Sequence, residues 1–140
     1  MLLAMLAVSA CARTQEPRVE RPWIRLAAVP GRPAAAYFTL HGGAKDATLT
    51  GASVAGVARA ELHESRMAAG GQGMTMDELS NVPVPAGGSV AFEPTGRHVM
   101  LFGVPAAMTA GGTARLTLRF DDGSVVAADA DVRGAGDGAP

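Results

Sequence analysis

From residue 23 onward, apolar and polar side chains alternate in short runs that are separated by turns rich in glycine and proline. Alternation with a period of two is typical of strands that bury one face. The runs that predict strands cover residues 23–28, 34–40, 48–54, 58–65, 74–79, 97–104, 113–120 and 124–132, with two shorter extended pieces inside 82–94. Asp121-Asp122-Gly123 joins the last two long runs as a hairpin signal.

The spacing of these runs favours an all-β fold. No segment has a long pattern with the helical period of 3.6 residues, and the best helix candidate, residues 61–69, is short and ends before Gly-Gly. Many short strands with turns between them predict an antiparallel sandwich or barrel. The chain has 140 residues, no internal repeat and no sign of a second domain, so we expect one domain with one core.

Charge and cysteine content exclude several classes of protein. The formal net charge is −1, which gives no electrostatic basis for binding nucleic acid. Cys11 is the only cysteine, so an internal disulfide is excluded. We expect a monomer.

The N-terminal segment MLLAMLAVSAC is a short apolar run that ends in small residues and a cysteine. It is too short to span a bilayer and is typical of a signal peptide. Val8-Ser9-Ala10-Cys11 resembles a bacterial lipobox, in which the cysteine is lipidated. We therefore expect an exported, periplasmic lipoprotein anchored to the membrane through Cys11. The expected divisions are a signal peptide at 1–10, a flexible tether at 11–20, a folded domain at 21–132 and a disordered tail at 133–140.

Methionine and histidine cluster in the middle of the chain. Residues 63–100 contain two of the three histidines and four of the seven methionines, namely His63, Met67, Met74, Met76, His98 and Met100. Thioether sulfur is a soft ligand and imidazole a borderline one, so together they favour Cu(I) over hard cations. His98 and Met100 are two apart on a predicted strand and share a face, as do Met74 and Met76. Methionine at alternate strand positions is also common in cores, and Met67 and Met108 are better explained by packing.

The segments ELHESRM, GMTMDEL and VPVPAGGSVAFEPTGRHVMLFGV resemble the periplasmic copper(I) chaperone family known as PCu(A)C. WIRLAAVPGRPAAAYFTL resembles the N-terminal strands of that family, and the likeness covers roughly residues 21–131. The resemblance implies a cupredoxin-like or immunoglobulin-like β-sandwich with Greek-key connections. It implies Cu(I) ligands at His63, Met76, His98 and Met100, with Met74 as an alternative to Met76. It also implies that the protein delivers copper for cytochrome oxidase, either to a subunit of the oxidase or to a partner copper chaperone.

Other chemistries fit the sequence less well. His63-Glu64 begins a zinc-protease motif, but position 67 is methionine. A blue-copper electron carrier needs a thiolate ligand, and Cys11, which lies ahead of the expected folded domain, cannot supply it. No catalytic arrangement stands out, so we expect no enzyme. Two alternatives remain open: an exported immunoglobulin-like module that binds a protein partner, and a copper buffering or resistance protein without an oxidase partner. If copper binds, neutral imidazoles are required, so affinity should fall below about pH 6.5.

Overall fold

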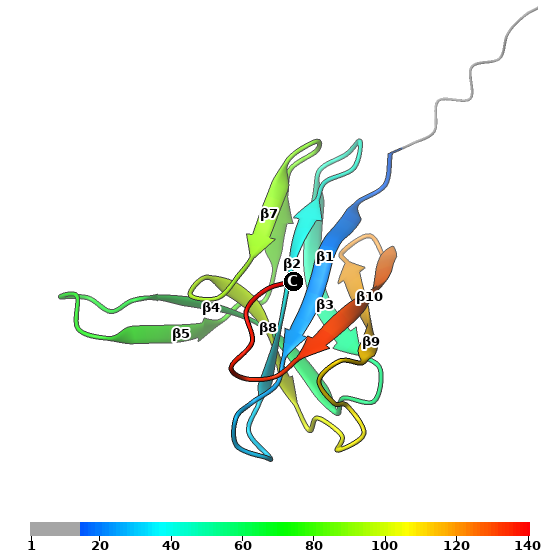
Figure 1. Ribbon diagram of the computed structural model, residues 1–140. Coiled ribbons are helices and arrows are strands. Elements are labelled where there is room, and N and C mark those ends of the chain that lie inside the picture. The colour runs from blue at the N-terminus through cyan, green and yellow to red at the C-terminus, as the bar shows by residue number, and fades with distance from the viewer. Residues whose placement is uncertain (1–14) are drawn as a thin grey trace, which may run out of the picture.

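Ten strands make up the regular structure of the computed structural model, which describes residues 15–140 (Figure 1). They are β1 (Arg18–Arg25), β2 (Ala34–His41), β3 (Ala47–Val54), β4 (Arg59–Met67), β5 (Met74–Glu78), β6 (Val82–Val84), β7 (Ser89–Phe92), β8 (Arg97–Phe102), β9 (Thr113–Phe120) and β10 (Val125–Arg133). The described part of the chain contains no helix, and the short helix candidate at 61–69 falls largely in β4. None of these residues therefore forms a helix that could cross a bilayer.

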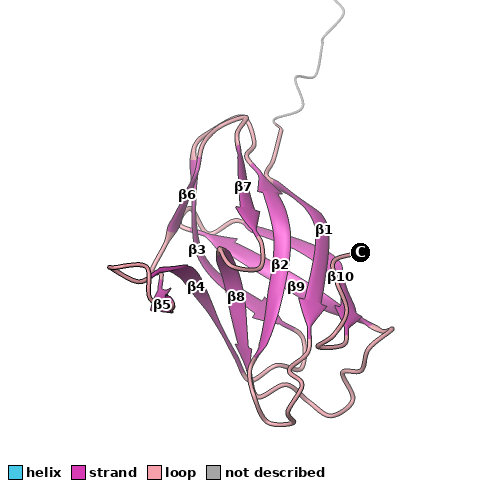
Figure 2. Ribbon diagram, turned by 60° about the vertical axis from the view of Figure 1, so that its left-hand side comes forward, coloured by secondary structure: helices cyan, strands magenta, loops and turns pink. Residues whose placement is uncertain are grey.

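The strands are hydrogen-bonded in the order β5-β4-β8-β2-β1-β10-β9-β3-β6, with β7 paired to β2. This path folds into two layers, one containing β8, β2 and β1 and the other containing β10, β9, β3 and β6 (Figure 2). The predicted all-β sandwich is confirmed. All strand pairs are antiparallel except β1 with β10, which run parallel and connect the two layers.

The main core lies between the layers and follows the predicted alternation. In β9, Leu116, Leu118 and Phe120 are buried and the residues between them are more exposed. The facing layer contributes alternate residues of β2 and β8, including Phe38 and Leu101. Because alternate side chains point to opposite faces of a strand, the residues between the buried ones lie on the outer face of each layer and do not enter this core.

A bulge in β1 changes which face its side chains occupy. The pairing with β2 shifts between Glu20 and Trp23, and Arg21 has a left-handed φ of 48°. Beyond the bulge, Trp23 lies opposite Tyr37 on the outer face of the layer, while Ile24 points into the core. Trp23 and Tyr37 are buried but do not belong to the main core. An extra residue in one strand is the usual way to re-aim side chains in this manner.

The β4–β5 hairpin projects from the body of the sandwich as an arm (Figure 1). Every residue of β5 is exposed, whereas Leu62 in the base of β4 is buried in the core. The hairpin turn contains Gly70, Gly71 and Gly73, all with positive φ. The arm therefore consists of two paired strands with little support from the core.

The chain ends bear on the expected divisions. The predicted signal peptide and Cys11 lie outside the described residues. β1 begins at Arg18, so the last residues of the expected tether already pair with β2. β10 extends to Arg133, and the following segment turns back, where the Gly134 N–H donates to the Asp137 carboxylate at 2.8 Å. Ala139 and Pro140 line a cavity beside Trp23.

Candidate metal centre

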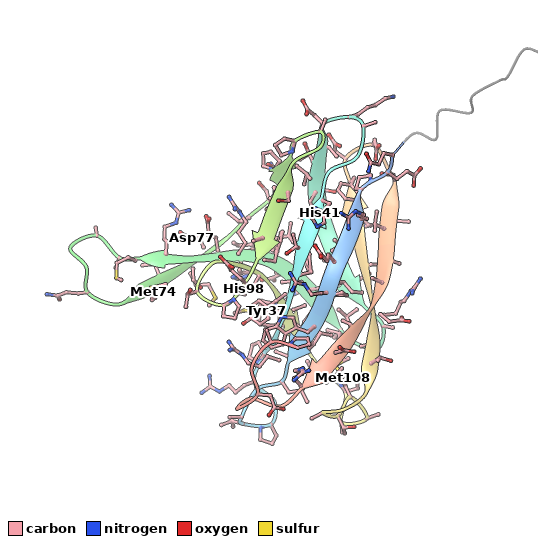
Figure 3. The ribbon with its side chains drawn as sticks, turned by 45° about the horizontal axis from the view of Figure 1, so that its top comes forward. Tyr37, His41, Met74, Asp77, His98 and Met108 are labelled. Atoms are coloured by element: carbon pink, nitrogen blue, oxygen red, sulfur yellow. The ribbon has the colours of Figure 1, made fainter. Side chains whose placement is uncertain are left out.

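His63 and His98 form a cross-strand pair. His63 of β4 lies directly opposite His98 of β8, and their ring centroids are 5.9 Å apart. Their strand neighbours Leu62 and Val99 point into the core, so the imidazoles lie on the outer face of the layer. Figure 3 shows His98 at the base of the arm, near Tyr37. Two residues that are 35 positions apart in the chain are thus adjacent because of strand register.

Each imidazole has one ring nitrogen in a hydrogen bond and one to which the described residues offer no hydrogen bond. His98 Nδ1 lies 3.1 Å from the carbonyl oxygen of Gly96, which places its proton there and leaves Nε2 with a lone pair. His63 Nε2 lies 2.9 Å from Oε2 of Glu61, and Nδ1 of His63 is buried without a hydrogen-bond partner. A hydrogen bond on one nitrogen that orients the other is typical of histidines that bind metals.

Met100 and Met76 lie on the same face as the histidines, in different positions. Met100 follows His98 by two residues, is half-buried and lies opposite Glu61 of β4. Met76 of β5 lies opposite Ser65, while Glu78 occupies the position opposite His63. His63 is therefore next to His98 and diagonal to both methionines. Diagonal neighbours have Cα atoms about 7–8 Å apart, within reach of long side chains.

The two imidazoles are sheltered from solvent, and burial affects their chemistry. His98 is 5% exposed, and the side chain of His63 is 12% exposed. Burial lowers the pKa of His98 below 6.5, and the nearby His63 and Arg25 act in the same direction against the Gly96 hydrogen bond. His98 is therefore neutral at neutral pH, which is the form that binds metal ions.

Glu61 is a site residue that the sequence analysis missed. It shares the face of His63 because it lies two residues earlier on β4, a spacing that could have revealed it. The hydrogen bond from His63, with Arg59 close by, holds its pKa below the usual value. Ligand atoms of Glu61, His63 and Glu78 all lie within 4.8 Å of one another. By contrast, Glu64 points to the opposite face, where it pairs with Arg66 and Arg97.

The other histidine and the isolated methionine lie elsewhere. His41 is at the end of β2, with Nε2 2.6 Å from a carboxylate oxygen of Glu20. Met108 packs against the main core. Met74, the alternative to Met76, lies opposite Met67 near the tip of the arm, farther from the histidine pair. Of the predicted ligands, the structure thus gathers His63, His98 and Met100 closely and places Met76 beside them on the arm.

The donor atoms at this face suit a soft monovalent ion. Imidazole nitrogen and thioether sulfur together favour Cu(I). The carboxylate of Glu61 lies beside His63 and can offset the positive charge of the ion. The unpartnered Nδ1 of His63 fits this interpretation, because a buried ring nitrogen without a hydrogen bond is costly unless something binds it.

Known proteins resemble the chain in sequence. A family model described as "Putative lipoprotein LpqE-like" matches residues 18–132. The "Putative lipoprotein Lxx21020" of Leifsonia xyli subsp. xyli is 35% identical over 108 residues, which are 76% of this chain and 63% of that protein. The chain therefore spans less than two thirds of the length of this curated relative.

Solved structures resemble it in fold. The Cu(I)-bound solution structure of DR1885 from Deinococcus radiodurans is 30% identical, with a TM-score of 0.57 over 89% of this chain and 83% of that one. The apo PCuAC domain from PmoF1 is 23% identical, with a TM-score of 0.70 over 86% of this chain and 96% of that domain. The second likeness concerns the fold, which is that of PCuAC domains.

Proposed function

Because this chain belongs to the LpqE-like family and has the fold of PCuAC domains, as its sequence resemblance implied, we propose that it is an exported Cu(I) carrier. The proposed ligands are His63, His98 and Met100, with Met76 of the arm completing the set. The observation that carries the proposal is the cross-strand histidine pair, in which one ring nitrogen of each imidazole has no hydrogen bond from residues 15–140. The 30% identical structure of DR1885, which holds Cu(I), supports the choice of ion.

The chemistry of the carrier is binding and exchange, without catalysis. Cu(I) tolerates low and irregular coordination, so an acceptor ligand can enter as a thioether leaves. The ligands differ in exposure, from His98 at 5% to Met76 at 50%. We propose that the histidines retain the ion while Met76 is the first ligand to be replaced. The acceptor is a cytochrome oxidase copper site or a partner copper chaperone.

The proposed cellular setting follows from the family and from the N-terminal sequence. The names of the family and of the curated relative describe lipoproteins. We propose that Cys11 carries a lipid anchor and that the domain works in the periplasm. The domain itself then corresponds to the stretch from about residue 18 to 132 that the family model covers.

The ligand set is tested by measuring Cu(I) affinity by competition with a chromophoric chelator. In the double variant His98→Gln/Met100→Leu we expect tight binding to be lost while circular dichroism still shows a folded β-protein. The matched control, His41→Gln/Met108→Leu, changes the same two residue types away from the site and should bind as the wild type does. Equal affinity in the two variants would refute the assigned ligands.

Delivery is tested separately from binding. The Cu(I)-loaded protein is mixed with the apo form of a soluble cytochrome oxidase copper domain, and the copper content of each is measured after separation. We expect copper to appear on the acceptor. As a control, the acceptor must be able to take Cu(I) from a weak complex. If it can and the carrier still retains all the copper, buffering is favoured over delivery.

A further inference from the structure

The arm carries three exposed methionines. The large apolar side chains that are exposed in the described part of the chain are Val29, Met67, Met74, Met76 and Val125. Met67, Met74 and Met76 are 62%, 51% and 50% exposed. They lie together on a hairpin that contributes little to the core, so packing does not explain them.

The three methionines share one face of the arm. Met67 of β4 lies directly opposite Met74 of β5, and Met76 follows Met74 by two residues. Side chains directly opposite each other have Cβ atoms about 4.5–5.5 Å apart, and diagonal neighbours are within reach of long side chains. Methionine has three rotatable bonds before its terminal methyl group. The three sulfur atoms can therefore converge on a single ion above the hairpin.

The opposite face of the arm is charged, which leaves the methionine face free. Arg66 of β4 pairs with Glu64 at 3.0 Å and with Asp77 of β5 at 3.3 Å. The pair with Asp77 joins the two strands on the side away from the methionines. The methionine side chains do not hold the two strands together. The arm can therefore keep its register when the thioethers bind a metal ion.

Met76 connects this face to the histidine pair. It lies opposite Ser65, between Met67 toward the tip and His63 toward the body, and is a diagonal neighbour of both. The sulfurs of Met74, Met67 and Met76 therefore lead along the arm to the imidazoles. An ion can move along this series by single ligand exchanges in which one sulfur leaves as the next ligand enters. The ion remains monovalent, so no oxidant or reductant is involved.

We propose that Met67, Met74 and Met76 form a second, thioether-only site for a soft monovalent cation, which receives the ion before the histidine pair. The direction of transfer rests on the proposed function, but binding at the arm does not. With one ion bound, Met76 serves the histidine site. When a second ion binds, Met76 joins Met67 and Met74, and His63, His98 and Met100 retain the first ion.

Ag(I) is a suitable probe because it is soft, monovalent and needs no reductant. The full chain is titrated with Ag(I), and the methionine methyl signals are followed by NMR together with the number of bound ions. We expect two binding events, the second of which shifts the Met67 and Met74 signals. The variant Met67→Leu/Met74→Leu should lose the second event and keep the first. Met108→Leu is the matched control and should keep both.

A second variant separates this site from the one proposed above. In His63→Gln/His98→Gln, we expect the first event to be lost and Ag(I) still to shift the Met67 and Met74 signals. If the wild type binds one ion at the histidines and these two signals do not move, the arm site is refuted and the carrier proposal stands. If Ag(I) shifts only the methyl signals of the arm and never that of Met100, the arm site stands and the assigned carrier site fails. Absence of any binding refutes both.

Discussion

At the scale of single residues, the orientation of two imidazole rings decides what the site can bind. Glu61 holds His63 through Nε2, and the carbonyl of Gly96 holds His98 through Nδ1. These bonds leave Nδ1 of His63 and Nε2 of His98 as the available donors. A set of fixed donors binds metal more tightly than the same groups in rotating side chains, because less side-chain freedom is lost on binding.

Replacing Glu61 should weaken metal binding without removing a ligand. In Glu61→Gln the acceptor to His63 loses its charge, so the ring is held less firmly and the positive charge of the ion is less well balanced. Loss of such a partner lowers metal affinity roughly 10–100-fold in known sites, and we expect about tenfold here. The measurement is Cu(I) competition with a chelator. Glu64→Gln, on the opposite face of β4, should leave the affinity unchanged; equal losses in the two variants would contradict this role of Glu61.

The lowered pKa of His98 should make the metal-free protein sensitive to acid. Above the ordinary value of 6.5, His98 is neutral in both the folded and the unfolded chain. Below it, the unfolded chain takes up the proton more readily, so the free energy of unfolding should fall as the pH drops from 6.5 toward the lower folded-state pKa.

This pH dependence is measured by urea unfolding at about pH 7 and about pH 5, where an ordinary histidine is respectively neutral and protonated. The variant His98→Gln cannot take up the proton and should lose less stability over this range. If the free energy of unfolding falls equally in the wild type and the variant, burial of His98 does not cause the pH dependence.

At the scale of elements, register and bulges bring the site together. The β4–β8 register sets His63 against His98, and the bulge at Arg21 turns Trp23 onto the same outer face. Trp23 packs on Tyr37, whose ring centroid is 6.4 Å from that of His98, so the bulge also provides the wall beside the site. The arm differs from these elements. At its base β4 also pairs with β8, but toward its tip β4 and β5 pair only with each other.

A glycine after β2 should be needed for the close approach of two turns. The Gly42 N–H donates to the Gly88 carbonyl at 2.8 Å, and a Cβ at position 42 would collide with the backbone carbonyl of Pro85. The backbone on both sides would have to move, so we expect Gly42→Ala to lower the free energy of unfolding by about 1–3 kcal/mol. The measurement is chemical denaturation.

Gly136→Ala is the matched control for this change, because a Cβ at position 136 meets no atom within 4 Å. It should leave the stability within about 0.5 kcal/mol of the wild type, as is usual for surface positions. A stable Gly42→Ala variant would mean that the two turns separate readily.

At the scale of the whole molecule, the main core and the site are on opposite faces of one layer. The core between the layers holds the strands in register, and the outer face of β4 and β8 presents the ligands. A site on core strands is held in place by packing, whereas the exposed arm can bring its ligands in and out.

Metal binding should therefore stabilise the folded protein, because the histidines meet only when β4 and β8 are paired. An ion that binds the folded state alone adds about 4 kcal/mol when its free concentration is 1,000 times the Kd. We expect Ag(I) to raise the Tm of the wild type. The same titration should give no comparable shift in His98→Gln/Met100→Leu, and an equal shift there would place the stabilising ion elsewhere.

The sequence alone determined the strands, their turns and the residue types available for chemistry. Alternation is a local property of the chain, so Leu116, Leu118 and Phe120 could be placed on one buried face without a structure. The grouping of His63, His98 and Met100 as candidate ligands came from ligand chemistry and from resemblance to a family.

Only the tertiary structure decided how these residues meet. Pairing between β4 and β8 is non-local, and a shift of one residue would have sent His63 to the other face. The outward position of the histidine pair follows from that register, and the separate pairing of β4 with β5 places Met76 on an arm. The bulge at Arg21 reverses the alternation of β1, which no period of two along the sequence could reveal.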